Sequence, residues 1–237
     1  MDKKPAPRAV LFDAYGTLFD VYSVGLTAEQ LFPGAGDRLG RLWRSLQIDY
    51  TRLASMGGAY QPFWDLTRAA LQAAAEQLGL SLSAEAEAQL MNQYRHLSAF
   101  PENRAVLQAL KARGIPTAIL SNGDPEMLAI AVRSAGFGEL LDHVLSVHAT
   151  RRYKTDPAAY QVGVDALGLP ARDMLFVSSN GWDAIGATWF GYQTLWVNRT
   201  GTPLERLGTT PHHQGQTLRD VLPLIDSLSS HHHQQRG

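Results

Sequence analysis

The sequence predicts an α/β protein: a parallel β-sheet wrapped by helices, with a helical block inserted after the first strand. Two observations support this prediction. From residue 101 onward short β-rich segments alternate with helical ones, and between residues 18 and 100 apolar residues recur only at helical spacing. We therefore expect a core domain formed by residues 1–17 and 101–237 and a helical cap subdomain formed by residues 18–100.

The first strand is expected at residues 8–13. A continuous apolar run leads into Asp13, and Gly16 and Thr17 follow in the predicted loop. Such a run is typical of a buried parallel strand. Because open α/β sheets carry their chemistry at the carboxyl ends of the strands, Asp13 is the leading candidate for a reactive carboxylate. The alternative is an aspartate that only caps or solvates the loop, since Asp is a common turn residue.

The inserted block is expected to hold about four helices. Apolar residues form helical stripes in residues 39–53 and 63–74, and Gly57 with Gly58 separates these two helices. Residues 27–30 have the spacing of a capping box, and Ser83 precedes another helical run. We expect helices to begin at both places and the block to cover the strand ends.

The remaining strands are expected at residues 115–121, 143–147, 174–179 and 193–198. Helices should lie between them. Asp124 and Asp156 are each followed by proline, which indicates an N-cap with proline at the first helical position, and a further helix should start near Asp183. The last nine residues, SSHHHQQRG, resemble a partly disordered tail.

Composition is that of an ordinary globular protein, with 237 residues, 45% apolar residues, 18% charged residues and a net charge of -1. Near-neutral charge gives no support for a nucleic-acid or membrane partner. No apolar run approaches the roughly 20 residues that span a bilayer, and we see no secretory signal, so we expect a cytoplasmic protein. The absence of cysteine excludes disulfides, thiolate nucleophiles and cysteine metal sites.

Polar residues at the ends of successive predicted strands should meet at one rim of the sheet. Each one alone has a structural explanation as a turn former, a surface lysine or a helix-start residue. Their order at successive strand ends indicates an active site. These residues are Asp13, Ser121, Asn122, Lys154, Ser178, Asn180 and Asp183.

The segments DAYGTL, LSNG and SSNGWD, with the lone Lys154, resemble the four motifs of the haloacid dehalogenase superfamily. This resemblance covers essentially the whole α/β part and implies a Rossmann-like core with Asp13 as nucleophile. Most members are magnesium-dependent phosphatases with a second Asp two residues after the nucleophile, where this chain has Tyr15. Tyr15 supplies neither the carboxylate ligand nor the acid that phosphoryl transfer uses. We therefore expect no magnesium, no other metal and no cofactor.

The pattern FDAYGTL, with WR in the cap, LSNG, YK and SSNGWD, resembles the L-2-haloacid dehalogenase (type II) branch more closely. Halide is a good leaving group that needs no protonation, so its displacement can dispense with acid and metal. The resemblance implies a hydrolase acting on carbon–halide bonds. It would convert short (S)-2-haloacids, haloacetates included, to (R)-2-hydroxy acids. Asp13 would attack C2 with inversion, and water would then attack the resulting ester at the Asp13 carbonyl carbon.

The resemblance also implies catalytic roles for other residues. Asp183 would activate the water, with Asn180 and Ser178 in the polar network. Thr17 would orient Asp13. Arg44 in the cap would receive the halide and, together with Lys154, offset the negative charges of Asp13, Asp183 and the substrate. From the sequence alone, an arginine whose stem covers apolar surface is the commoner outcome for Arg44.

Substrate contacts follow from the same resemblance. The Ser121 hydroxyl and backbone N–H groups near Tyr15 and Asn122 would hold the substrate carboxylate, and Tyr160 would support the site. An apolar wall would surround the alkyl group, although each of its residues could equally be plain core. The wall residues would be Tyr15, Ile48, Phe63 and Trp182.

Two rival functions stay open on the sequence. One is a magnesium-dependent phosphatase of the same superfamily, which Tyr15 disfavours. The other is a non-catalytic protein that binds a small carboxylate, which the joint presence of Asp13, Lys154, Arg44 and Asp183 disfavours. We also expect a homodimer, because many relatives are dimers.

Overall fold

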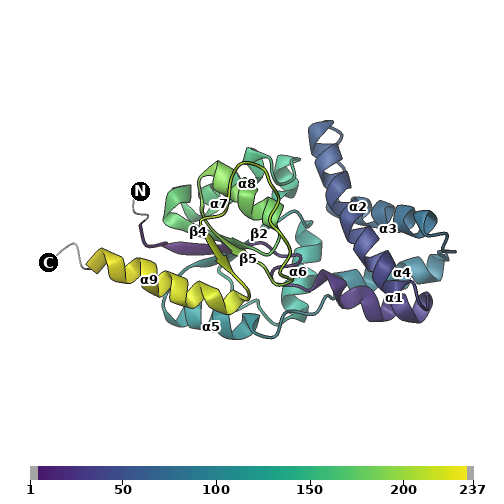
Figure 1. Ribbon diagram of the computed structural model, residues 1–237, viewed down its shortest axis with the longest axis horizontal. Coiled ribbons are helices and arrows are strands. Elements are labelled where there is room, and N and C mark those ends of the chain that lie inside the picture. The colour runs from purple at the N-terminus through teal and green to yellow at the C-terminus, as the bar shows by residue number, and fades with distance from the viewer. Residues whose placement is uncertain (1–4, 234–237) are drawn as a thin grey trace.

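The computed structural model describes residues 5–233, and its centre is a parallel six-stranded sheet (Figure 1). The strand order is β3-β2-β1-β4-β5-β6, so the sheet reverses its direction of growth beside β1, as doubly wound folds do. This confirms the predicted fold class. The strands are β1 (Ala9–Phe12), β2 (Thr117–Ser121), β3 (His143–Ser146), β4 (Met174–Ser178), β5 (Gln193–Val197) and β6 (His213–Gly215).

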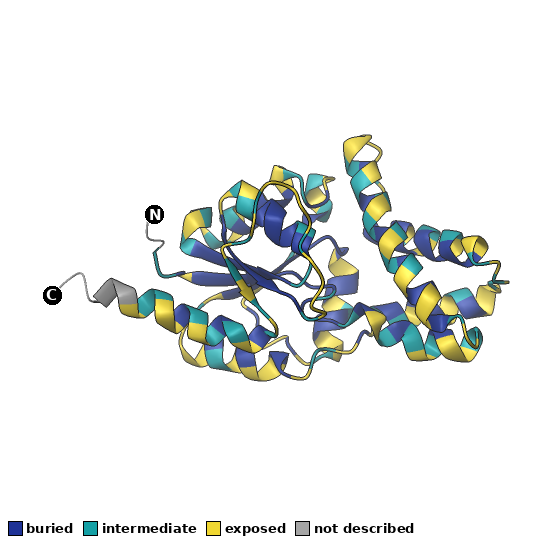
Figure 2. Ribbon diagram, viewed as in Figure 1, coloured by how far each residue is buried: buried dark blue, intermediate teal, exposed yellow. Residues whose placement is uncertain are grey.

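Helices cover both faces of this sheet. Helices α7 and α8 lie on one face and α5 and α9 on the other (Figure 1). Every residue of β1, β2, β4 and β5 is buried, which explains their nearly continuous apolar runs (Figure 2). The core helices are α5 (Asn103–Ala112), α6 (Pro125–Ser134), α7 (Pro157–Leu167), α8 (Gly181–Phe190) and α9 (Val221–His233).

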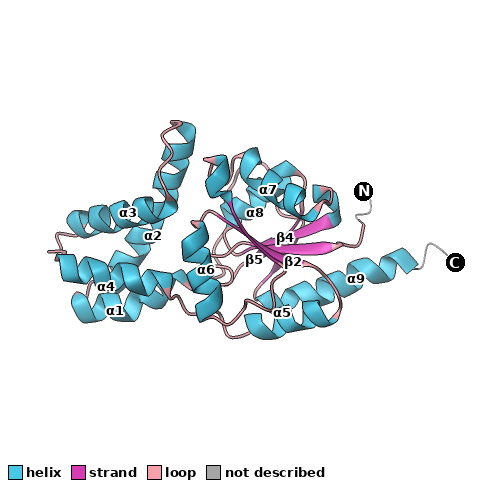
Figure 3. Cartoon of the chain, turned by 180° about the vertical axis from the view of Figure 1, so that it is seen from behind, coloured by secondary structure: helices cyan, strands magenta, loops and turns pink. Residues whose placement is uncertain are grey.

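A separate group of helices lies at the carboxyl end of the sheet (Figure 3). Helices α2 and α3 pack closely, and the indole of Trp43 donates to the carbonyl oxygen of Thr67 at 2.8 Å. The chain enters and leaves this group side by side, because residues 18–20 pair with residues 98–100. These helices are α1 (Gly25–Leu31), α2 (Gly36–Met56), α3 (Phe63–Gln77) and α4 (Ala84–Arg95).

Most local predictions are confirmed, with strand ends one or two residues shorter than expected. Ser83 and Asp156 each cap the following helix through the side chain, and α2 ends at the Gly57 position. The capping box at residues 27–30 is wrong, because α1 already begins at Gly25 and its N-cap residue makes no side-chain bond. Glu29 instead accepts from the backbone of Gly34 and Gly36, next to the start of α2.

The last strand and the last helix of the core, β6 and α9, were not predicted from the sequence. Strand β6 has only three residues, and α9 continues through His233, so that part of the expected tail is helical. Residues 234–237 lie outside the described residues. Helix α9 contacts α5 and buries Val221 and Ile225. Within residues 5–233, no helix is long and apolar enough to cross a bilayer.

Candidate active site

The parallel register of the sheet brings the predicted site residues to one rim. Phe12 pairs with Ile119 of β2 and Val177 of β4, so Asp13 emerges between the ends of these two strands. The backbone N–H of Asp13 donates to the carbonyl oxygen of Val177 at 2.9 Å. Lys154 comes from the loop before α7, and Asp183 lies in the first turn of α8.

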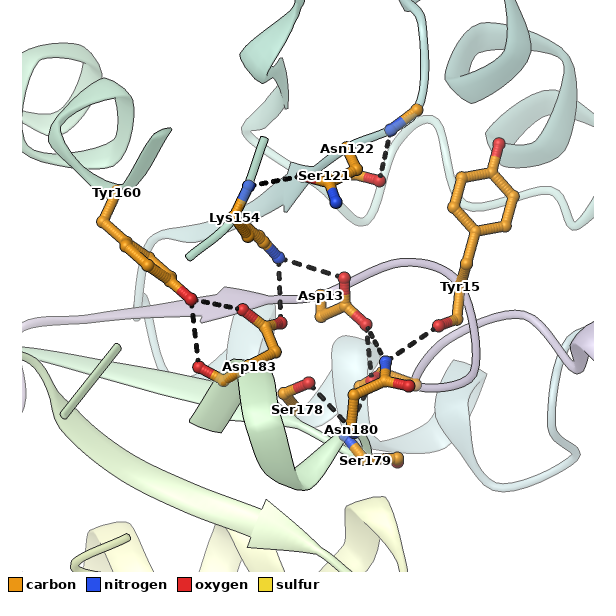
Figure 4. A network of polar contacts seen from close by, with 12 residues as sticks. Asp13, Tyr15, Ser121, Asn122, Lys154, Tyr160, Ser178, Ser179, Asn180 and Asp183 are labelled. Carbon is orange, nitrogen blue, oxygen red and sulfur yellow. Dashed lines mark hydrogen bonds and ion pairs between the residues drawn. The ribbon is translucent and has the colours of Figure 1, made fainter. Parts of the chain in front are cut away.

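Lys154 lies between two carboxylates (Figure 4). Its Nζ is 3.0 Å from Oδ1 of Asp13 and 3.0 Å from Oδ2 of Asp183. The lysine and Asp183 are fully buried, and Asp13 is 6% exposed. Burial alone would lower the pKa of Lys154, but the charges of Asp13 and Asp183 outweigh it and hold this pKa above its ordinary value. The ammonium therefore stays charged.

The second carboxylate, Asp183, is tuned by its surroundings. Burial raises the pKa of Asp183 to about 6; Lys154 opposes this shift, and the charge of Asp13 adds to it. The Tyr160 hydroxyl donates to Asp183 Oδ1 at 2.8 Å, and burial raises the pKa of Tyr160 so that it stays a phenol. Near neutral pH, Asp183 is an ionised carboxylate that can readily accept a proton.

The other oxygen of Asp13, Oδ2, accepts two further hydrogen bonds. The Thr17 hydroxyl donates to it at 3.1 Å and the Asn180 amide at 2.8 Å. Both donors are held in turn: Thr17 Oγ1 accepts from the N–H of Ser179, and Asn180 N–H donates to Ser178 Oγ. The carboxylate of Asp13 is therefore fixed from three sides.

A small cavity opens beside Asp13. In this conformation it encloses about 20 Å³, room for roughly one water molecule. Residues from both the sheet rim and the helical group form its walls. They are Asp13, Tyr15, Arg44, Ile48, Thr51, Phe63, Ser121, Asn122, Asn180 and Trp182.

Arg44 reaches this cavity from α2. Its Nη2 donates to the carbonyl oxygen of Tyr15 at 3.1 Å and to Asn180 Oδ1 at 3.3 Å, while Nη1 donates to Gln47 Oε1 at 2.8 Å. All three acceptors are neutral oxygens. The guanidinium is therefore oriented without being neutralised, and its charge is available to an anion in the cavity.

The loop after β2 approaches the cavity very closely. Asn122 Oδ1 accepts from the backbone N–H of Lys154 at 3.0 Å, and Ser121 Oγ accepts from the N–H of Gly123 at 3.1 Å. A Cβ atom at Gly123 would lie 2.6 Å from Cε2 of Tyr15, so this close approach requires glycine.

A family model described as haloacid dehalogenase-like hydrolase matches residues 7–191. The chain belongs to this family. The (S)-2-haloacid dehalogenase of Pseudomonas sp. (strain YL) is 42% identical over 222 residues, which cover 94% of this chain and 96% of the relative.

Solved structures agree with this assignment of the chain to the haloacid dehalogenase-like hydrolases. The L-2-haloacid dehalogenase RSc1362 is 57% identical with a TM-score of 0.92, covering 93% of this chain and 99% of that one. The enzyme from Xanthobacter autotrophicus with chloropropionic acid covalently bound is 34% identical with a TM-score of 0.87, covering 93% and 98%. The resemblance to the L-2-haloacid dehalogenase branch is confirmed.

In this haloacid dehalogenase-like hydrolase, the predicted residues fall in two places. Arg44, Ser121 and Asn122 line the cavity, as do the four predicted wall residues Tyr15, Ile48, Phe63 and Trp182. Tyr160, predicted to support the site, is not among the residues that line this cavity; it is fully buried and donates to Asp183 Oδ1.

Sequence reasoning missed Thr51 and Gln47. Thr51 lines the cavity, and Gln47 holds Arg44 while bonding to Thr67 and Tyr94. Gln47 follows Arg44 by three residues and Thr51 follows it by seven, so both lie on the same face of α2. The helical periodicity of α2 could therefore have pointed to them.

The donor set of this family member does not suit a divalent cation. Across the described residues 5–233, no group of three or more His, Asp or Glu side chains could hold a metal ion. The ammonium of Lys154 lies between Asp13 and Asp183, where it already balances their charge. Tyr15 adds no anionic ligand, since burial raises its pKa well above the ordinary value.

Proposed function

We propose that this protein is a hydrolytic (S)-2-haloacid dehalogenase that converts short (S)-2-haloacids, haloacetates included, to (R)-2-hydroxy acids and halide. The observation that carries the proposal is the buried Lys154 ammonium, 3.0 Å from both Asp13 and Asp183, beside a cavity that Arg44 enters. A nucleophilic carboxylate, an internal cation and a second cation facing the cavity are what halide displacement requires. No metal and no cofactor is part of this proposal.

The first step is a displacement at carbon. An oxygen of Asp13 attacks C2 of the substrate, the C–O bond forms as the carbon–halogen bond breaks, and the electron pair leaves with the halide, inverting C2. Arg44 pairs with the departing halide. Ser121 Oγ and backbone N–H groups near Tyr15 and Asn122 hold the substrate carboxylate.

The second step hydrolyses the ester on Asp13. Water attacks the ester carbonyl carbon and gives a proton to Asp183, and donors from Lys154 and Asn180 stabilise the oxyanion. The C–O bond between the Asp13 carbonyl carbon and the product oxygen then breaks, and the alkoxide takes the proton from Asp183. The second proton of the attacking water, left on Asp13, passes to solvent and restores the Asp13 carboxylate. The hydroxyl oxygen of the product therefore comes from Asp13, and the oxygen of water stays in Asp13.

The charge balance favours these two reaction steps over metal-assisted chemistry. Asp13, Asp183 and the substrate carboxylate bring three negative charges, and Lys154 and Arg44 bring two positive ones. Displacement converts the Asp13 carboxylate to a neutral ester, so the internal charges balance better once the halide has left. The neutral phenol of Tyr15 adds no charge to either step.

A halide-release panel tests the proposal. It covers fluoro-, chloro- and bromoacetate and both enantiomers of 2-chloropropionate, with 4-nitrophenyl phosphate plus magnesium as the control. We expect chloride and (R)-lactate from (S)-2-chloropropionate and no phosphate release. Phosphate release without halide release would favour the phosphatase, and carboxylate binding without turnover would favour the binding protein.

We further propose a homodimer in the cytoplasm. Leu53 and Met56 on α2 are 62% and 84% exposed and supply apolar surface for a contact between copies. Sedimentation equilibrium measures the mass of the assembly directly, and a monomer at micromolar concentration would contradict the dimer.

A further inference from the structure

Asp124 belongs to the core loop after β2, but its carboxylate binds the start of a cap helix. Its Oδ1 accepts from the backbone N–H of Phe63 at 3.1 Å and its Oδ2 from that of Trp64 at 2.7 Å. These residues begin α3, whose own N-cap residue, Pro62, makes no side-chain bond. Asp124 also makes no capping bond to α6, the helix that directly follows it. Asp124 thus satisfies the free N–H groups of a helix about 60 residues away in sequence.

The helix start that Asp124 holds forms part of the cavity wall. Phe63 lines the cavity and stacks on Tyr15, with ring centroids 5.6 Å apart. Gly123, next to Asp124, lies against the Tyr15 ring. The loop of residues 121–124 therefore fixes one aromatic wall residue by direct contact and the other through the Asp124 carboxylate.

His148 contacts this carboxylate as well, and Tyr60 contacts His148 in turn. His148 Nδ1 lies 3.0 Å from Asp124 Oδ1 and 2.9 Å from the Tyr60 hydroxyl. The Asp124 side chain is 13% exposed. Its three polar partners, the N–H groups of Phe63 and Trp64 and the His148 ring, therefore restrict where it can move, and the N-terminus of α3 offsets its negative charge.

We propose that Asp124 is a positioning residue that sets the size limit for the alkyl group of the substrate, by fixing Phe63 relative to Ser121 and Asn122. The inference rests on the proposed function and names its substrate class as 2-haloacids with hydrogen or methyl at C2. Ser121 and Asn122 hold the carboxylate end, so the distance to Phe63 decides how large a C2 substituent fits. In a cavity this small, a modest shift of α3 changes that distance appreciably.

The expected effect is a change in selectivity. A methylene group against a hydrophobic pocket wall changes kcat/KM by about 10–200-fold. In Asp124→Ala we expect kcat/KM to fall about tenfold for (S)-2-chloropropionate and less than about threefold for chloroacetate, which has no methyl group to contact Phe63. The preference for (S)-2-chloropropionate over (S)-2-chlorobutyrate should shrink by about tenfold, mainly through KM.

Two further variants separate positioning from stability. Asp124→Asn keeps one carbonyl oxygen at the N-terminus of α3 but turns an amide group toward the second N–H, so we expect it to lose less selectivity than Asp124→Ala. Ser83→Ala removes the matching cap of α4, where Ser83 accepts from the N–H of Ala86 at 3.2 Å away from the cavity. It should lower the melting temperature without changing the selectivity.

The assay measures chloride release from the three substrates, with melting temperatures recorded for each variant. Wild-type enzyme that releases no chloride would refute the proposed function. With wild-type turnover in hand, unchanged selectivity in Asp124→Ala, or an equal change in Ser83→Ala, would overturn the positioning role. If Asp124→Ala does not fold, Asp124→Ser takes its place, because the serine side chain is too short to reach both N–H groups. The quantity compared is again kcat/KM for (S)-2-chloropropionate relative to that for (S)-2-chlorobutyrate.

Discussion

Replacing Lys154 by methionine removes the cation between Asp13 and Asp183 while nearly preserving the volume of the side chain. At an effective dielectric constant near 20, each of the two 3.0 Å contacts is worth about 5.5 kcal/mol before desolvation. Removing one partner from a buried ion pair leaves uncompensated charge and typically costs about 3–5 kcal/mol. In Lys154→Met we expect a loss of this size in the free energy of unfolding near neutral pH.

Lys154→Met should also lower activity, because Lys154 influences the ionisation of Asp183. Lys154 opposes the burial that raises the pKa of Asp183, so without the lysine this pKa rises further and a larger share of Asp183 is protonated at neutral pH. The protonated form cannot accept a proton from water. If about 4 kcal/mol of transition-state stabilisation is lost, kcat falls about a thousandfold.

Chloride release from (S)-2-chloropropionate and urea unfolding measure the two effects in the same preparation. Lys111→Met, at an exposed lysine of α5, is the matched control and should leave both unchanged. More than a tenth of wild-type activity in Lys154→Met, or an unaltered free energy of unfolding, would refute the electrostatic role of Lys154.

The remaining predictions concern acidity, the cap cation and metals. Asp183 acts as base only after the ester has formed, so its ionisation should control kcat. The pKa of Asp183 is about 6 in the free enzyme, and ester formation removes the Asp13 charge that helps to raise it, so kcat should fall as pH drops below about 6; a kcat that stays flat from pH 4 to 8 would contradict its role as base. Arg44→Met should lower kcat/KM at least a hundredfold, about 2.7 kcal/mol, with a small change in melting temperature; near-normal turnover would mean that Arg44 only supports the cap. Dialysis against EDTA should leave halide release unchanged. Loss of halide release on dialysis, restored by added magnesium, would contradict a metal-independent reaction.

The parts of the fold with strong local signals could be predicted from the sequence. The apolar run before Asp13 marks a central strand because β1 is buried on both faces. Asp156 before Pro157 marks the start of α7 because its carboxylate bonds to the adjacent helix. Strand β6 was missed because three residues with little apolar character carry no periodic signal.

The less predictable features depend on contacts between residues distant in the sequence. Asp124 is followed by proline just as Asp156 is, yet its carboxylate caps α3 rather than α6. Local spacing could not indicate this, because the choice depends on how the cap lies on the core. Tyr160 is similar, since its position behind Asp183 follows from the packing of α7 against α8.

The most direct test of covalent catalysis by Asp13 is one turnover in H₂¹⁸O with enzyme in excess over (S)-2-chloropropionate. Mass spectrometry of the peptide that contains Asp13, and of the lactate, locates the heavy oxygen. We expect ¹⁸O in Asp13 and ordinary oxygen in the hydroxyl group of the lactate. Heavy oxygen in that hydroxyl group, with an unlabelled Asp13, would mean that water attacks the substrate directly and would contradict the aspartyl ester.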